Sequence, residues 1–405
     1  MSESSGIDVA VRRGQVSRPA AFAAIAAIFV LFMAASSAPS PLYVVYQQLW
    51  KFSATTLTVI FAVYVVALIG SLLVLGALSD HIGRRPVLLA AIGLEVLALV
   101  LFIVAGNVTV LLIARVLQGL ATGAAMTTLG AALVDLNPPH APRRAGVVNG
   151  VVPTAGLALG ALGCGALVQF APAPTKLIFA LLIAGMVVAA GAVWLLPETS
   201  ARRPGARASL TPRLGVPSRI RGEFYALIPI LVASWSLGGL YLSLGPSIAA
   251  GIFDLRSHLI GGVVVALLCA TGAVTAYLLQ RAVPARVLLL SAALLTAGTA
   301  VSLVGLELDL VALAAAGTVI AGIGFGGSAL ATFGTLAKLA GPAERGELFA
   351  VALVIAYPGF SVPAVAAGFA ATSFGLHSTA LVYGSGVIVL CLLALGAQGL
   401  RARTR

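Results

Sequence analysis

The chain has 405 residues, of which 60% are hydrophobic and 9% are charged, and its formal net charge is +12. Soluble domains are about 45–50% apolar and about 25% charged, so this composition excludes a soluble fold. The basic residues are spread over short loops between apolar runs, whereas a nucleic-acid-binding protein gathers them on one surface. We therefore expect an integral membrane protein with no nucleic-acid partner.

Apolar runs recur along the whole chain, and a run of about 20 residues is long enough to cross a bilayer as a helix. We predict an all-α membrane protein with twelve transmembrane helices. The predicted spans cover residues 20–46, 55–77, 86–105, 109–136, 143–170, 176–196, 224–250, 258–281, 285–305, 309–338, 344–371 and 375–399.

The basic residues predict the orientation of these spans. With the N-terminus inside, twenty basic residues fall on the cytoplasmic side and three, Lys51, Lys176 and Arg256, fall outside. The twenty are Arg12, Arg13, Arg18, Arg84, Arg85, Arg143, Arg144, Arg202, Arg203, Arg207, Arg213, Arg219, Arg221, Arg281, Arg286, Lys338, Arg345, Arg401, Arg403 and Arg405. Under the positive-inside rule this asymmetry places both termini in the cytoplasm. We expect a multi-pass protein of the cell membrane, inner or plasma.

The longest polar stretch, residues 198–223, lies midway along the chain and combines three prolines with six arginines. This composition is typical of an interfacial linker. We therefore expect a six-helix N-terminal bundle at 1–197, a cytoplasmic linker at 198–223 and a six-helix C-terminal bundle at 224–405, in a pseudo-symmetric pair.

A short polar turn separates the second and third predicted spans and reads GALSDHIGRRP over residues 76–86. It resembles the cytoplasmic loop between helices two and three of the major facilitator superfamily, Gly-x-Leu-x-Asp-x-x-Gly-Arg-Arg/Lys. The defining positions are Gly76, Asp80, Gly83, Arg84 and Arg85. The resemblance implies a clasp between the two bundles in the outward-open state. The alternative is an ordinary basic loop.

Asp135 lies at the cytoplasmic end of the predicted fourth span. The same resemblance implies a charge relay between Asp135 and the turn at residues 76–86. The alternative is a solvated carboxylate at a helix end.

Arg115 lies inside the predicted fourth span, where an arginine costs at least about 2.5–3.5 kcal/mol on insertion scales. Gln118, Gly119, Thr122 and Met126 follow at helical steps, so the five residues share a face that we expect to meet water or protein. Arg115-x-x-Gln118-Gly119 resembles the fourth-helix signature of proton-coupled members of the superfamily. The alternative is a structural hydrogen-bonding role for Arg115.

Glu95 is the one carboxylate deep inside the predicted spans of the first half. Helix lengths place it within two helical turns of Arg115 in depth. Because burial disfavours an ionised carboxylate, we predict that Glu95 carries a proton and releases it under the influence of Arg115 or of hydration. The alternative is a structural acid that stays protonated or paired.

Glycines recur along the predicted fifth span, among them Gly156, Gly160 and Gly163. The segment 156–163 resembles the glycine-rich fifth-helix motif of drug:proton antiporters, although that motif has proline where this chain has Ala161. Close helix packing is the alternative explanation, since small residues let helices approach in lipid.

The predicted spans of the second half offer aromatic rings and hydroxyls without a fixed carboxylate, which suits a neutral or weakly polar ligand. Together with Gly119, Thr122 and Met126, we predict a substrate cavity formed by Trp235, Phe325, Ser328, Thr332 and Tyr357. The alternative is that the aromatic residues line a membrane interface.

These features predict a secondary transporter of the major facilitator superfamily that works by alternating access. The leading hypothesis is proton-coupled efflux of small, largely apolar compounds by a monomer. The alternative is a proton-coupled importer or a facilitator of a small solute such as a sugar or a metabolite. An enzyme is disfavoured because the four histidines fall in loops or near helix ends, and no phosphate-binding Gly-x-x-x-x-Gly-Lys-Ser/Thr motif occurs. The cysteines have no metal-ligand spacing, so we expect neither metal nor cofactor.

Overall fold

The computed structural model describes residues 16–138, 140–141, 143–212, 214–255, 257–341 and 344–403. Within these ranges the secondary structure is helical throughout, with no strand. Five of the basic residues used to predict the orientation, Arg12, Arg13, Arg213, Arg256 and Arg405, lie outside the described residues.

Twelve spans long and apolar enough to cross a membrane occur among the described residues, which confirms the predicted fold class. In the first half of the chain they are α1 (Arg18–Ser37) with α2 (Pro39–Trp50), α3 (Ala54–Leu75), α5 (Arg84–Val104), α6 (Val108–Asp135), α7 (Arg144–Phe170) and α8 (Leu177–Leu195). In the second half they are α9 (Arg221–Ser243), α11 (His258–Leu278), α12 (Pro284–Glu307), α13 (Val311–Leu339), α14 (Arg345–Phe374) and α15 (Leu376–Arg403). The short elements are α4 (Leu78–Ile82), α10 (Gly245–Gly251), η1 (Ala208–Leu210) and η2 (Ser218–Ile220).

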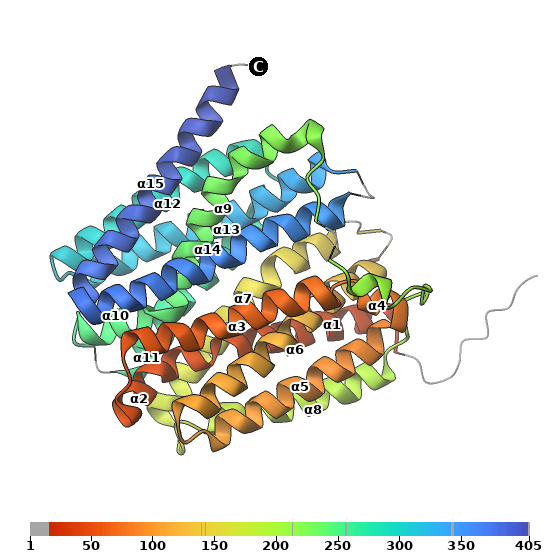
Figure 1. Cartoon of the computed structure of the whole chain (residues 1–405), viewed down its shortest axis with the longest axis horizontal. Coiled ribbons are helices and arrows are strands. Elements are labelled where there is room, and N and C mark those ends of the chain that lie inside the picture. Colours follow the sequence, from red (N-terminus) through yellow and green to blue (C-terminus); the bar gives the residue numbers. More distant parts are fainter. Residues whose placement is uncertain are drawn as a thin grey trace, which may run out of the picture.

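The helices form two bundles that follow the two halves of the chain. In Figure 1 the first half, coloured red to yellow-green, lies below the second half, coloured green to blue. One apolar core lies in the second half, and another consists mostly of first-half residues, joined by Leu240, Leu244 and Ala367 of the second half. A third core, with Phe61, Tyr64, Val265 and Tyr357 among its members, combines residues of both halves.

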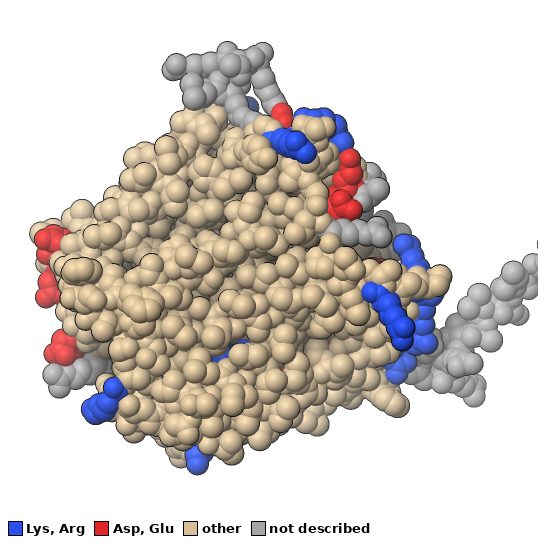
Figure 2. All heavy atoms as spheres, in the orientation of Figure 1, with Lys and Arg blue, Asp and Glu red and all other residues tan. Residues whose placement is uncertain are grey.

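On the face shown in Figure 2, charged side chains gather at two opposite ends of the molecule, and the belt between the ends is tan apart from one small patch of blue. We name these ends after the short helices that lie there, the α4 end and the α10 end (Figure 1). Because apolar side chains cover the belt, the belt is the part of the surface that suits the hydrocarbon core of a bilayer.

The two halves pack closely at the α10 end. The start of α3 meets the end of α14, where the Thr55 and Thr372 hydroxyl oxygens are 3.0 Å apart. The end of α7 meets the start of α11, where Gln169 accepts a hydrogen bond from the backbone N–H of His258 at 2.9 Å. A Cβ added at Gly368 would collide with Thr58, so this glycine permits the approach of α14 to α3.

Candidate functional site

The loop that joins α3 to α5 is folded around one glycine and one carboxylate. Gly83 has φ +112°, a backbone conformation that L residues rarely adopt. Immediately after it, the backbone N–H groups of Arg84 and Arg85 donate to the Glu198 carboxylate at 2.8 and 3.2 Å. The carboxylate of Glu198 therefore binds the N-terminus of α5, where the helix dipole favours negative charge.

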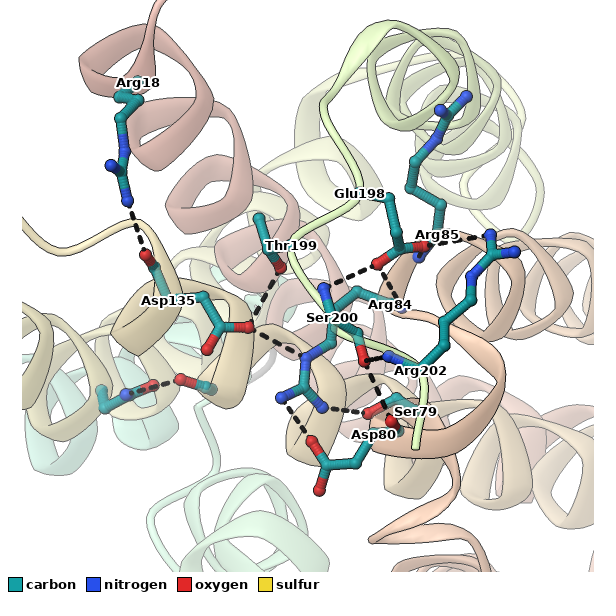
Figure 3. Close-up of polar contacts among 12 residues, drawn as sticks. Arg18, Ser79, Asp80, Arg84, Arg85, Asp135, Glu198, Thr199, Ser200 and Arg202 are labelled. Atoms are coloured by element: carbon teal, nitrogen blue, oxygen red, sulfur yellow. Dashed lines mark hydrogen bonds and ion pairs between the residues drawn. The ribbon is translucent and has the colours of Figure 1, made fainter. Parts of the chain in front are cut away.

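The Arg84 side chain points back into the loop, as Figure 3 shows, and is only 8% exposed. Its guanidinium lies 2.5 Å from Asp80 and 3.1 Å from Asp135, and it also donates to Ser79 at 2.6 Å. Arg84 thus joins α4 to the end of α6 through bonds to two carboxylates and a hydroxyl. Such charge-assisted bonds are roughly twice as strong as neutral ones.

The segment that follows α8 fastens the loop from its other side (Figure 3). Ser200 donates to the Asp80 carbonyl at 3.0 Å, and Thr199 donates to the Asp135 carboxylate at 3.0 Å. Arg85 is directed away from this network and donates to the carbonyl of Trp194. Gly76 is the C-cap residue of α3 and has right-handed helical backbone angles. All of these contacts lie within the first half and the segment that follows it.

Sequence reasoning missed Glu198, Ser79, Thr199 and Ser200 as parts of this network. One signal was available for Glu198, because it is the first charged residue after the sixth apolar run and the predicted topology places it beside an arginine-rich loop. Ser79, Thr199 and Ser200 carry no charge and no spacing that would have distinguished them.

Inside the first half, three predicted residues form one hydrogen-bonded chain. Gln118 lies between the other two: its amide nitrogen donates to Glu95 at 3.0 Å, and its amide oxygen accepts from Arg115 at 2.5 Å. Glu95 and Gln118 are 0% exposed and Arg115 is 1% exposed. Within the described residues no direct ion pair joins Arg115 to Glu95, so the amide of Gln118 couples the acid to the guanidinium.

Backbone oxygens and aromatic rings complete the surroundings of this chain. The Ser36 carbonyl at the end of α1 accepts a hydrogen bond from the Arg115 guanidinium at 3.2 Å. The Arg115 guanidinium lies 4.6 Å from the ring of Tyr64 on α3 and 5.6 Å from that of Tyr43 on α2. Since Tyr64 belongs to the core shared by the two halves, Arg115 lies inside the first half directly behind the interface.

At the interface, three of the predicted cavity residues come together. The hydroxyl of Tyr357 on α14 is 3.7 Å from the sulfur of Met126 on α6. The ring of Trp235 on α9 packs against Tyr357 at 4.7 Å between centroids, in an edge-to-face arrangement. Phe360, which sequence reasoning missed, lies 5.1 Å from Phe61 of the first half and extends the same group of rings.

The other predicted cavity residues lie within one half or the other. Gly119 faces α3, and Thr122 is fully buried beside Ser36. Ser328 and Thr332 are 1% exposed inside the second half. Phe325 packs where α13 meets α9 and α11. The structure therefore separates the predicted set into an interface group and two buried groups.

The glycines of α7 differ in what they face. A Cβ added at Gly156 would collide with Met33, and one at Gly160 would collide with the Ala34 carbonyl, both on α1. Gly163 has open space around it instead. Gly156 and Gly160 thus let α7 lie directly against α1.

The second half also contains an apolar, partly open cavity of about 180 Å³ between α9, α10, α11, α12 and α13. At its wall the hydroxyls of Tyr241 and Thr318 are 2.8 Å apart. This cavity is separate from the ring cluster at the interface.

Comparisons with known proteins agree with this architecture. The model of the Major Facilitator Superfamily matches residues 23–363. The structure of the human organic anion transporter MFSD10 (TETRAN) is similar at a TM-score of 0.67 and 16% identity, over 94% of this chain and 100% of that chain. The structure of a bacterial homolog of the human lysosomal transporter Spinster, inward-facing and unoccupied, is similar at a TM-score of 0.73 and 14% identity, over 96% of this chain and 98% of that chain.

No curated protein matches the chain. The family match covers most of the sequence, and the likeness to the two solved structures extends over nearly the whole fold. The protein is accordingly a multi-pass membrane transporter rather than an enzyme, and it belongs to the Major Facilitator Superfamily.

Proposed function

We propose that the protein is a secondary active transporter that expels small, largely apolar compounds in exchange for protons. The observation that carries this proposal is the buried chain of Glu95, Gln118 and Arg115, placed directly behind the interface of the two halves. A buried carboxylate and a buried guanidinium are costly in a membrane span and are usually functional.

Protonation of Glu95 would change the charge of these three hydrogen-bonded side chains without changing their arrangement. An ionised Glu95 accepts strongly from the Gln118 amide, whereas a protonated carboxyl is a weaker acceptor. The Gln118 amide would pass the change to Arg115, whose guanidinium lies against the Tyr64 ring. Because Tyr64 packs in the shared core, the protonation state would bias how the two halves pack.

The packing of the halves supports alternating access. At the α10 end the halves are joined through α3 with α14 and through α7 with α11, while the Arg84 network at the α4 end is satisfied within the first half and the segment after it. We propose that this is the state open toward the α4 end. In the opposite state the loop with Asp80, Arg84 and Arg85 would clasp the two halves.

The charge distribution supports an orientation with the α4 end and both termini in the cytoplasm of a cell membrane. Arginines predominate in the loops of that end, as the positive-inside rule requires. The protein would act as a monomer, with each molecule containing both halves of one transport path.

The predicted cavity residues at the interface support a neutral, largely apolar substrate. Met126, Trp235 and Tyr357 offer a thioether, two aromatic rings and a hydroxyl. No acidic residue lies between Glu223 and Asp254 on the second half's first span, or between Glu347 and the end of α14. A neutral, largely apolar compound fits such a surface because it leaves no charge unpaired.

The test is transport of two probes, neutral Nile red and cationic ethidium, by cells that produce the protein and by vesicles with an imposed pH gradient. We expect the producing cells to accumulate less Nile red than control cells, and a protonophore to abolish the difference. Accumulation of the probe inside the cells together with protons would contradict efflux and favour the import of a solute.

A further inference from the structure

Unpartnered polar atoms concentrate at one place in the molecule. Among the described residues, seven buried side-chain nitrogen or oxygen atoms lack a hydrogen-bond partner in the protein. Five of them lie on three adjoining helices of the first half: Ser40 Oγ, Tyr43 Oη, Tyr46 Oη, Glu95 Oε2 and Arg115 Nε. A buried polar group without a partner is destabilising, so a concentration of five requires an explanation.

A series of contacts leads from the acid to α2. Glu95 connects to Arg115 through Gln118, and the Arg115 guanidinium lies 5.6 Å from the Tyr43 ring. On α2 the three hydroxyl residues are spaced three apart, at positions 40, 43 and 46, and therefore share one helix face. All three are at most 2% exposed.

We propose that Ser40, Tyr43, Tyr46, Arg115 and Glu95 form an internal water-binding site that conducts protons from the α10 end to Glu95. An ordered buried water typically makes about three hydrogen bonds to otherwise unsatisfied polar groups, and this series offers both donors and acceptors. The proposed hydration of the site is argued from the unpartnered atoms, whereas its proton-carrying role rests on the proposed function.

After a proton has passed along the path, every water and hydroxyl has the same protonation state as before, and only Glu95 has changed. Each water or hydroxyl accepts a proton on its oxygen and gives up its own, so it leaves the step unchanged. At the inner end the Glu95 carboxylate takes one proton and becomes a neutral carboxyl. The ionisable groups that face the path are Arg115 from α6, Tyr64 from α3, Tyr43 and Tyr46 from α2, and Cys164 from α7.

The outer end of the path is covered by an aromatic side chain of the same helix. The Trp50 ring stacks on the Tyr46 ring at 4.7 Å. Helix α2 also packs against α10 and α11 of the second half, and Gln47 accepts a hydrogen bond from Ser247 at 3.4 Å. Separation of the halves at the α10 end would remove these contacts and let Trp50 move from Tyr46, which couples proton entry to the conformational change.

Hydroxyl-radical footprinting by X-ray radiolysis tests the hydration directly, because it modifies buried side chains that lie beside bound water. On the full chain in lipid nanodiscs, we expect Tyr43 and Tyr46 to be modified at least five-fold faster than Phe102 and Phe179. These two phenylalanines are matched controls, since they are equally buried in the first half and stack only on each other. Equal, slow modification of all four rings would overturn the proposal.

The proton-carrying role is tested with Tyr43→Phe and Tyr46→Phe, each of which removes one hydroxyl and keeps the ring. We expect Nile red transport driven by a pH gradient to fall at least five-fold, with a larger solvent isotope effect, while Nile red counterflow without a gradient stays within two-fold of the original protein. Tyr225→Phe, a control at a ring that is 59% exposed, should leave both rates unchanged.

The outcomes separate the two proposals. Fast modification of Tyr43 and Tyr46, together with unchanged gradient-driven transport in Tyr43→Phe and Tyr46→Phe, would overturn the proton path and leave a structural water site. If the original protein shows no gradient-driven transport at all, the proposed function fails, and the footprinting result then decides the water site by itself. A loss of counterflow equal to the loss of driven transport would also contradict the relay, because it would indicate a merely structural role.

Discussion

At the scale of single residues, the proposed proton coupling depends on an acid and a guanidinium that bond to the same amide. Gln118 donates to Glu95 and accepts from Arg115, so each charged group has a partner although the two do not touch. A direct ion pair with Arg115 would keep Glu95 ionised. An intervening amide lets the carboxyl gain or lose its proton while Arg115 stays bonded.

Replacement of Glu95 by glutamine keeps an acceptor for Gln118 and removes the titrating group. We expect Glu95→Gln to lose the pH dependence of Nile red transport while Nile red counterflow continues within about two-fold. The measurement is transport between pH 5.5 and pH 8 in vesicles. An unchanged pH profile would remove Glu95 from the mechanism.

Glu344 provides a matched control on a carboxylate outside the spans. The hydrogen bond from Arg219, with a further one from the Gly341 backbone, lowers the pKa of Glu344 to about 2. Because the carboxylate of an unfolded chain titrates near about 4.3, this pair stabilises the fold above that pH and its contribution is lost as the pH falls toward about 2. We expect Glu344→Gln to lower the melting temperature at pH 7 and to leave the transport profile between pH 5.5 and pH 8 unaltered.

The neighbouring arginines of the loop should differ in importance. The Arg84 side chain is buried among Asp80, Asp135 and Ser79, whereas the Arg85 side chain contacts the Trp194 carbonyl and the Trp194 ring. We expect Arg84→Ala to cost about 2 kcal/mol, since hydrogen bonds to charged groups are worth about 1.5–3 kcal/mol and Asp80 is partly exposed. Arg85→Ala should cost less than half as much in thermal unfolding in detergent. Equal losses would refute the assignment.

The sequence motif predicted which residues of the loop matter but not what holds them. The roles of Asp80, Arg84 and Asp135 were expected from the resemblance to the signature loop of the superfamily. Glu198, which binds the start of α5, is more than 100 residues from Arg84 in sequence. The predicted topology places Glu198 on the same side as the loop, but a single sequence does not show which residue it pairs with, because Glu198 lies in a polar segment without periodicity.

At the scale of helices, α7 shows how glycine sets the distance between neighbours. Gly156 and Gly160 lie against α1, while Gly163 on the same helix has open space. The motif at residues 156–163 therefore contains both packed and free positions, and the spacing alone did not distinguish them. In lipid, such close packing is a main source of helix association.

The same substitution should have different effects at a glycine packed against α1 and at a glycine with open space around it. We expect Gly160→Leu to lower the yield of folded protein strongly, because its side chain would occupy the space of the Ala34 carbonyl and the Ser37 hydroxyl. Gly163→Leu should fold normally, and Gly163→Ala should be slightly stabilising, by up to about 1 kcal/mol of helix propensity. Size-exclusion profiles in detergent and melting temperatures measure both. Similar yields for the two leucine variants would contradict the packing.

The twelve spans were predictable because long apolar runs have few alternatives in a membrane chain. The ends of the first and seventh spans were not. The predicted span at 224–250 ends as α9 at Ser243 and continues as the separate helix α10. The first span continues past Pro39 as α2 to Trp50. Apolar residues run through both junctions, so hydropathy cannot mark the change of helix.

At the scale of the whole molecule, the two halves meet tightly at the α10 end, and the proposed alternating access requires this end to open. A disulfide between Thr55→Cys and Thr372→Cys should hold it closed, because the hydroxyl oxygens of these residues are 3.0 Å apart. We expect oxidation to stop Nile red transport and a reductant to restore it. The native Cys164, Cys269 and Cys391 are free and buried, so they should not interfere. Undiminished transport by the oxidised protein would refute opening at this end.

The most direct measurement of the central claim is the distance between spin labels across the two halves at each end, by pulsed EPR in nanodiscs at pH 5.5 and pH 8. Exposed positions for the labels are Leu49 and Ser373 at the α10 end, and Ala77 and Gly346 at the α4 end. We expect a change of pH to lengthen one distance and shorten the other, and Glu95→Gln to abolish that exchange. Distances that stay fixed at both ends, or that respond to pH equally with Glu95→Gln, would contradict a proton-driven alternation of the two halves.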